Sequence, residues 1–309
     1  MSQTAVARFV GWLPTEVDAR VRALAAASLV GQIVLIVTGG AVRLTSSGLG
    51  CPTWPRCTAD SLTTTPEMGF HGVIEFGNRL LTFALAAVAL AMVVALWNLR
   101  KKRGDLFWLA IALLASIPAQ AVIGGISVLT QLNPWVVALH FLVSMALVVF
   151  ATLLVNRTYG RTGANMTRTL PALPGSMRPV MLATAVAAAL AVVLGVVVTG
   201  AGPHAGDADA PRNGLDWDLV SHIHAVPAYL VTFGALFGVV VVVSRRLHGP
   251  FRNAVAALLG LTVLQAAIGI TQYYTGIPAL LVGLHMFVAA LLMAAAVNAA
   301  DLARWSPKA

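Results

Sequence analysis

The sequence is short of charged residues. Only 10% of its 309 residues are Asp, Glu, Lys or Arg, whereas soluble domains carry about 25%. Hydrophobic residues make up 59% of the chain, and the mean hydropathy is +0.85. This composition excludes a soluble globular protein. It also excludes a disordered chain, because disorder requires low hydrophobicity together with high charge density.

Acidic residues and cysteines are scarce as well. The chain has 11 Asp and Glu against 20 Lys and Arg, which gives a net charge of +9. The basic residues are scattered between apolar stretches and form no basic stripe of the kind that nucleic-acid-binding proteins show, so we expect no nucleic-acid partner. Two cysteines, Cys51 and Cys57, cannot hold together a chain of this length, so any disulfide is local.

What the sequence does contain is a series of long apolar stretches. A helix that crosses a bilayer needs about 20 apolar residues. Eight stretches meet this length: 21–42, 72–98, 106–129, 134–156, 179–200, 218–244, 252–273 and 278–300. We therefore predict an all-α polytopic protein of the lipid bilayer, with eight transmembrane helices.

The distribution of basic residues predicts the orientation. Of the 20 Lys and Arg residues, 16 lie in the termini and loops on one side of the predicted spans. The exceptions are Arg43, Arg56, Arg79 and Arg212. Because membrane proteins place excess Lys and Arg in the cytoplasm, we expect both termini there. Residues 1–20 lack an apolar stretch of signal-peptide length, and the bacterial plasma membrane is the expected location.

The two longest outer loops are 43–71 and 201–217, and both are rich in Gly and Pro. The first of them holds both cysteines in the run CPTWPRC. Outside the membrane the surroundings are oxidising, so a disulfide between Cys51 and Cys57 is expected, either structural or redox-active. The alternative is a pair of free thiols.

The two halves of the sequence repeat a pattern of polar residues. Gln120 is followed 20 positions later by His140, and Gln265 is followed 20 positions later by His285. Each half contains four spans, an even number, so both halves have the same orientation in the membrane. The repeat predicts two pseudo-symmetric four-helix bundles.

This organisation divides the chain into five segments. The two bundles are separated by a cytoplasmic linker and flanked by two short cytoplasmic ends. The predicted segments are the N-terminal segment 1–20, the bundle 21–156, the linker 157–178, the bundle 179–300 and the tail 301–309.

Three histidines lie inside the apolar spans. His140 and His285 are several residues from the nearest loop, and His224 lies near the outer end of the sixth span. Ionisable groups in a membrane are costly and are functional candidates, although one histidine alone could simply hydrogen-bond to a neighbouring helix. The repeat offset leads us to expect that His224 on the sixth span and His285 on the eighth face each other inside a bundle. This predicts bis-His ligation of a haem iron.

The N-terminal half differs at one of the two matching positions. It keeps His140, but Asn78 stands where the C-terminal half has His224. Glu75 lies one turn before Asn78 on the same helix face. A haem bound here would have one strong axial ligand and a weak or vacant second position, which permits oxygen chemistry, whereas a closed bis-His site favours electron transfer.

Several motifs resemble those of the haem A synthases. They are VTGGAVRLTSSGLGCPTWPRC at 37–57, IEFGNRLL at 74–81 and the sequences around His140 and His285. Members of this family are membrane oxidoreductases that convert a methyl group of haem O to a formyl group, giving haem A for cytochrome c oxidase. The resemblance covers about residues 25–300 and is closest to the actinobacterial branch.

The resemblance implies specific roles for the polar residues. A haem b would lie between His224 and His285, and His140 would bind the substrate haem O. Glu75 matches the family's essential acidic residue. Many members have a histidine at the position of Asn78, so His71 becomes a candidate for the missing ligand.

The resemblance also implies partners. These are the substrate haem O, the product haem A, the haem O synthase and the cytochrome c oxidase assembly pathway. It leaves open whether the chain forms a homo-oligomer. Two other functions compete with it: a di-haem b-type cytochrome that relays electrons, and a haem carrier or insertion protein without chemistry. A di-haem cytochrome predicts four ligands, and Asn78 argues against that.

Overall fold

A computed structural model describes residue 8 and residues 11–309. Residues 1–7, 9 and 10 lie outside the described residues, and with them part of the predicted segment 1–20. Eight long helices form the described chain: α2 (Ala19–Leu44), α3 (Gly69–Ala95), α4 (Gly104–Leu129), α5 (Pro134–Thr158), α6 (Met177–Ala201), α7 (Trp217–Ser244), α8 (Pro250–Tyr274) and α9 (Ala279–Trp305). Each is long and apolar enough to cross a membrane. The prediction of an all-α protein with eight spans is therefore confirmed.

Side-chain caps fix the starts of several helices. The carboxylate of Asp18 accepts a hydrogen bond from the Val21 N–H at 3.0 Å, and that of Asp216 accepts one from the Leu219 N–H at 2.8 Å. Asn133 caps α5, which then begins with Pro134. Such caps satisfy N–H groups that have no partner within the helix, so they mark where each span begins.

The last helix is longer than its apolar stretch suggests. The predicted span ends at residue 300, but α9 continues to Trp305. Asp301 is buried because its Oδ2 accepts hydrogen bonds from Asn156 Nδ2 at 3.0 Å and Thr162 Oγ1 at 2.6 Å. A satisfied carboxylate can stay inside, so the helix passes through this polar residue.

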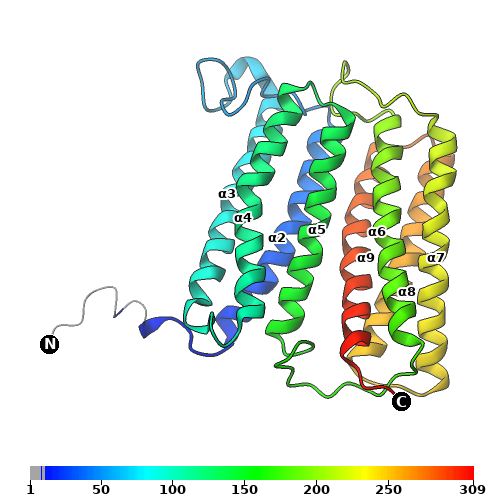
Figure 1. Cartoon of the computed structure of the whole chain (residues 1–309). Coiled ribbons are helices and arrows are strands. Elements are labelled where there is room, and N and C mark those ends of the chain that lie inside the picture. Colours follow the sequence, from blue (N-terminus) through cyan, green and yellow to red (C-terminus); the bar gives the residue numbers. More distant parts are fainter. Residues whose placement is uncertain (1–7, 9–10) are drawn as a thin grey trace.

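The helices stand side by side in two groups, α2–α5 and α6–α9 (Figure 1). Contacts between the groups are made by α9 with α2 and α5, and by α5 with α6. This arrangement is compatible with the predicted pair of four-helix bundles.

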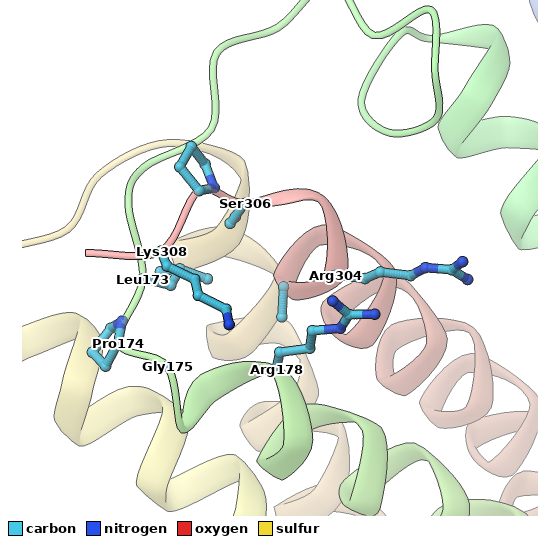
Figure 2. A pocket seen from close by; sticks show the side chains of 9 residues that line it. Leu173, Pro174, Gly175, Arg178, Arg304, Ser306 and Lys308 are labelled. Atoms are coloured by element: carbon cyan, nitrogen blue, oxygen red, sulfur yellow. The ribbon is translucent and has the colours of Figure 1, made fainter.

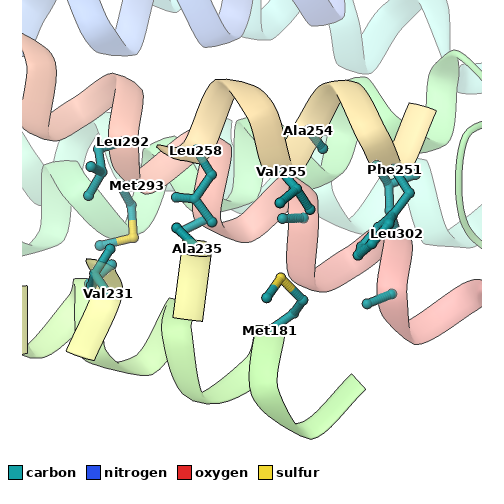
Figure 3. Close-up of a cluster of buried hydrophobic side chains, with 14 of the residues drawn as sticks. Met181, Val231, Ala235, Phe251, Ala254, Val255, Leu258, Leu292, Met293 and Leu302 are labelled. Carbon is teal, nitrogen blue, oxygen red and sulfur yellow. The ribbon is translucent and has the colours of Figure 1, made fainter. Parts of the chain in front are cut away.

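The densest packing lies toward the side of the Arg-rich loops. One cluster of buried apolar residues centres on Met181, Phe251 and Leu258 in the C-terminal group (Figure 3). A second cluster in the N-terminal group includes Met92 and Leu154. Most residues of both clusters lie in the helix halves nearest the Arg-rich loops, whereas His140, His224 and His285 lie near the opposite helix ends.

Candidate functional site

The candidate residues lie at similar depth from the helix ends that are opposite the Arg-rich loops. His140 and His285 each follow the start of their helix by six residues, and His224 follows the start of α7 by seven. At a rise of 1.5 Å per residue, these positions lie about 9–10 Å below the helix ends. Glu75 and Asn78 occupy the corresponding part of α3.

The structure brings His224 and His285 together. Their ring centroids are 6.3 Å apart, with an angle of 65° between the ring planes. Two imidazoles that bind one metal ion through bonds of about 2 Å each have centroids about 6 Å apart. The distance between the two rings therefore matches the requirement of a single metal ion between them.

The chemistry of these two rings also fits a bound metal. Within the described chain, the Nδ1 atoms of His224 and His285 are buried and have no hydrogen-bond partner. Each of these Nδ1 atoms lies against a glycine of the neighbouring helix, 3.6 Å from a Cβ built at Gly195 or Gly269. Imidazole is a common ligand of haem iron, so the pair fits a haem held between α7 and α9.

A glycine on the neighbouring helix faces each intramembrane histidine. A Cβ atom at these glycines would lie only 3.1–3.2 Å from the histidine Cε1 atom. The contacts pair Gly124 with His140, Gly195 with His224, and Gly269 with His285. The absence of a side chain lets each ring lie against the neighbouring backbone, which restricts how it can rotate.

The repeated glutamines explain the 20-residue spacing. Gln120 Nε2 donates to the backbone oxygen of His140 at 3.2 Å, and Gln265 Nε2 donates to that of His285 at 3.1 Å. The same contact thus occurs once in each half. It ties the histidine-bearing helix to its neighbour at the depth of the ring.

The N-terminal half has one imidazole where the other half has two. The His140 Nδ1 is also buried without a partner among the described residues. Asn78 is held by α2, because the Thr38 hydroxyl donates to its Oδ1 at 2.7 Å. This half therefore offers a single histidine and a tethered amide.

Glu75 is buried and fully engaged. Its Oε2 accepts a hydrogen bond from the Cys51 N–H at 2.5 Å, and its Oε1 lies 2.5 Å from Arg79 Nη2. Arg79 also donates to the backbone oxygens of Cys51 and Thr53 at 3.4 and 3.3 Å. Glu75 lies beyond the first turn of α3, and together with Arg79 it fastens the first outer loop to this helix.

The expected disulfide is present in that loop. Cys51 and Cys57 are bonded, and both are fully buried. Between them, Trp54 packs against α4 so closely that a Cβ at Gly125 would lie 2.4 Å from the indole. Sequence reasoning missed Trp54. The adjacent glycines of α4 were the available signal, since one faces His140 and the other faces this indole.

His71 lies closer to the outer surface than the other candidates. It is exposed in the first turn of α3, and its Nδ1 is hydrogen-bonded to the Ser47 hydroxyl at 2.9 Å. Asn78 is seven residues further along the helix, which corresponds to about 10 Å. The structure thus does not bring His71 to the depth of His140.

Arg43 makes contacts that the sequence did not indicate. It donates from Nη2 to the Thr199 oxygen at 2.8 Å and from Nε to the His204 oxygen at 2.5 Å. His204 in turn is hydrogen-bonded to the Ile277 oxygen at 2.8 Å. This arginine at the end of α2 therefore links the two halves near the outer face.

Comparison with known proteins identifies the family. The family model described as cytochrome oxidase assembly protein matches residues 22–297. The chain belongs to this family. The match covers both halves and every candidate site residue, and it agrees with the resemblance inferred from the motifs.

Curated members similar to the chain carry the name Heme A synthase. The protein of Lysinibacillus sphaericus is 32% identical over 137 residues, which is 42% of this chain and 43% of the relative. That of Exiguobacterium sibiricum is 32% identical over 127 residues, covering 40% and 41%. That of Bacillus pumilus is 33% identical over 132 residues, again covering 40% and 41%. The chain thus spans about two fifths of the length of the curated relatives it matches.

Proposed function

We propose that this protein is a haem A synthase, a membrane oxidoreductase that converts a methyl group of haem O to a formyl group. Its product would be haem A for cytochrome c oxidase assembly. One observation carries the proposal: two opposed imidazoles in one half, and a single buried imidazole in the other, where Asn78 stands in place of the second. This asymmetry suits one half for electron transfer and the other for chemistry.

His224 and His285 would hold a haem b, and the group would supply electron transfer when bound. The chain's own contribution is to fix the two rings. Gly195 and Gly269 let the rings lie against neighbouring helices, and Gln265 ties α8 to the backbone of α9. These contacts orient both imidazoles before any ligand arrives.

His140 would hold the iron of the substrate haem O in the N-terminal half. Asn78 would face the other side of the porphyrin, where its tether to Thr38 keeps the amide at α2. His71, the alternative second ligand, would have to reach from about 10 Å further toward the end of α3, and Ser47 engages its Nδ1, so we favour Asn78.

Glu75 would hold or move a proton beside the reacting edge of haem O. Its two oxygens are fixed by Cys51 and Arg79, so the carboxylate is oriented rather than mobile. The loop around the Cys51–Cys57 disulfide, with Trp54 packed on α4, would cover the site and limit access of water.

The proposal also gives the protein a location and assigns a role to each of the two bundles. We place the protein in the bacterial plasma membrane with both termini in the cytoplasm, because most of its Lys and Arg residues lie on that side. Residues 21–156 would form the catalytic bundle and residues 179–300 the haem b bundle. The haem O synthase and the oxidase assembly pathway would be the functional partners.

Co-expression with a haem O source tests the proposal. We expect chromatography of extracted pigments to show haem A with the native chain. Glu75→Gln should keep haem b but yield no haem A, whereas Glu67→Gln, an exposed carboxylate just before α3, should behave like the native chain.

The pigments also separate the competing functions. A native chain that binds haem O yet forms no haem A would overturn the synthase and favour a carrier. Haem A formation by Glu75→Gln would contradict the role of Glu75. A four-ligand low-spin spectrum without haem A would favour the di-haem cytochrome.

A further inference from the structure

The segment after α9 folds back onto the linker between the two halves. Leu173 N–H donates to the Pro307 oxygen at 2.8 Å, and Ala309 N–H donates to the Leu173 oxygen at 2.9 Å. These bonds form a short parallel bridge between Leu173 and Lys308. The bridge joins the linker to the end of α9 on the side of the Arg-rich loops.

A small pocket of about 40 Å³ lies beneath this bridge. Its wall consists of the linker, the first turn of α6 and the end of α9, and it includes Arg178, Arg304 and Lys308. Figure 2 shows the Lys308 side chain extending toward Arg178, and the Arg178 side chain extending toward the end of α9, where Arg304 points outward. Since one water needs about 10–15 Å³, the pocket has room for a group of about phosphate size.

The three cations have no anionic partner in the described part of the chain. None of them takes part in any of its ion pairs. The acid nearest in sequence, Asp301, is one turn before Arg304, but its Oδ2 accepts from Asn156 and Thr162. Three unpaired cations around one pocket favour an anion, and arginine forks suit phosphate oxygens best.

We propose that this pocket binds the phosphate group of an anionic phospholipid. The lipid source is favoured over free phosphate by position, because the pocket lies where two spans meet the membrane surface: α6 begins at Met177, and α9 ends at Trp305. Tryptophan is enriched at this boundary, and basic pockets between membrane helices bind anionic headgroups. The bound headgroup would neutralise the cluster and fasten α9 to the linker.

A charge-matched pair of variants tests the site. The pocket variant is R178Q/R304Q/K308Q. The control, R100Q/K101Q/K102Q, removes three exposed cations from the turn between α3 and α4, in the other helix group (Figure 1). Delipidated full-length protein in neutral detergent is titrated with phosphatidylglycerol, phosphatidylcholine or inorganic phosphate. At 0.15 M salt, attraction between exposed charges that are more than about 8 Å apart is largely screened.

Phosphatidylglycerol should raise the melting temperature and remain bound in native mass spectrometry, for the native chain and the control alike. Its affinity should fall on the order of 100-fold in the pocket variant, given three cations near an anionic headgroup. Phosphatidylcholine should bind no variant tightly. The single variant R178Q should lose part of the affinity for phosphatidylglycerol. It replaces the triple variant in the test if the triple variant folds poorly.

Two results would overturn the proposal. Equal losses in the pocket variant and the control would show only diffuse attraction to a basic surface. Stabilisation by inorganic phosphate that matches that of the lipid, and that the pocket variant loses, would reassign the site to a free phosphate ion.

Discussion

The three glycines that face histidines matter because they have no side chain. At Gly195, a Cβ would lie 3.1 Å from the His224 ring, so the imidazole would have to shift by a few tenths of an ångström. Overpacking of this kind typically costs about 1–3 kcal/mol. The glycines are therefore part of the candidate site, although they offer it no functional group.

Gly195→Ala should accordingly weaken binding of the haem that we propose between His224 and His285. We expect haem b occupancy to fall several-fold, because the alanine displaces one axial imidazole. Pyridine haemochrome analysis of the purified protein measures the occupancy. Gly260→Ala is the matched control, since no atom lies within 4 Å of a Cβ built there. Equal occupancy in both variants would show that the glycine contact does not position the ring.

Asn78 stands at the position where the C-terminal half has the histidine His224. Asn78→His should place a second imidazole opposite His140 and break the hydrogen bond from Thr38. We expect an additional low-spin bis-His signal in visible and electron paramagnetic resonance spectra when haem O is supplied. Haem A formation should fall, because the open side of the substrate haem becomes ligated. A spectrum identical to that of the native chain would place Asn78 away from the porphyrin.

At the scale of elements, the first outer loop and α3 form one unit. Glu75 and Arg79 hold the loop backbone, the disulfide closes it, and Trp54 anchors it on α4. A carboxylate expected to do chemistry thus also organises the loop above it. On the helix alone, Glu75 would keep its ion pair with Arg79 but would lose the hydrogen bond that the Cys51 N–H donates.

Removing the disulfide should loosen this unit locally. For so short a loop, the chain-entropy model gives about 2 kcal/mol for C51S/C57S. We expect faster hydrogen exchange of the residue 51 N–H, which donates to Glu75, and unchanged exchange in the turn between α7 and α8. Hydrogen-exchange mass spectrometry measures both. Unchanged exchange around residue 51 would show that Glu75 and Arg79 hold the loop by themselves.

At the scale of the whole molecule, polar contacts join the two halves at both faces. Arg43 links α2 to the end of α6 near the outer face. At the inner face, Asn156 of α5 and Thr162 of the linker donate to Asp301 of α9. Between them the helix groups meet through apolar packing, so the polar links fix the register of one half against the other.

Asp301→Ala should destabilise the joined structure. It leaves the Asn156 and Thr162 donors buried without an acceptor, and each unsatisfied group costs about 1–3 kcal/mol. We expect a clearly lower melting temperature and increased protease sensitivity in the linker. Asp209→Ala, at an exposed position in an outer loop, is the control. A melting temperature equal to that of this control would show that the inner link contributes little.

The sequence alone determined the architecture, because the bilayer imposes a length and an apolar composition on every span. It also indicated the repeat, the disulfide and the three histidines, since ionisable groups are rare enough in a membrane to stand out. The family followed from motifs that lie close together along the chain.

Only the tertiary structure decided which partners these residues have. The contacts of Glu75 with the disulfide loop, of Trp54 with Gly125, and of Asp301 with the other half join residues far apart in sequence. The basic residues that line the pocket beneath the linker bridge are also far apart in sequence. No local pattern encodes such contacts, because they depend on how the helices pack and on where each loop returns.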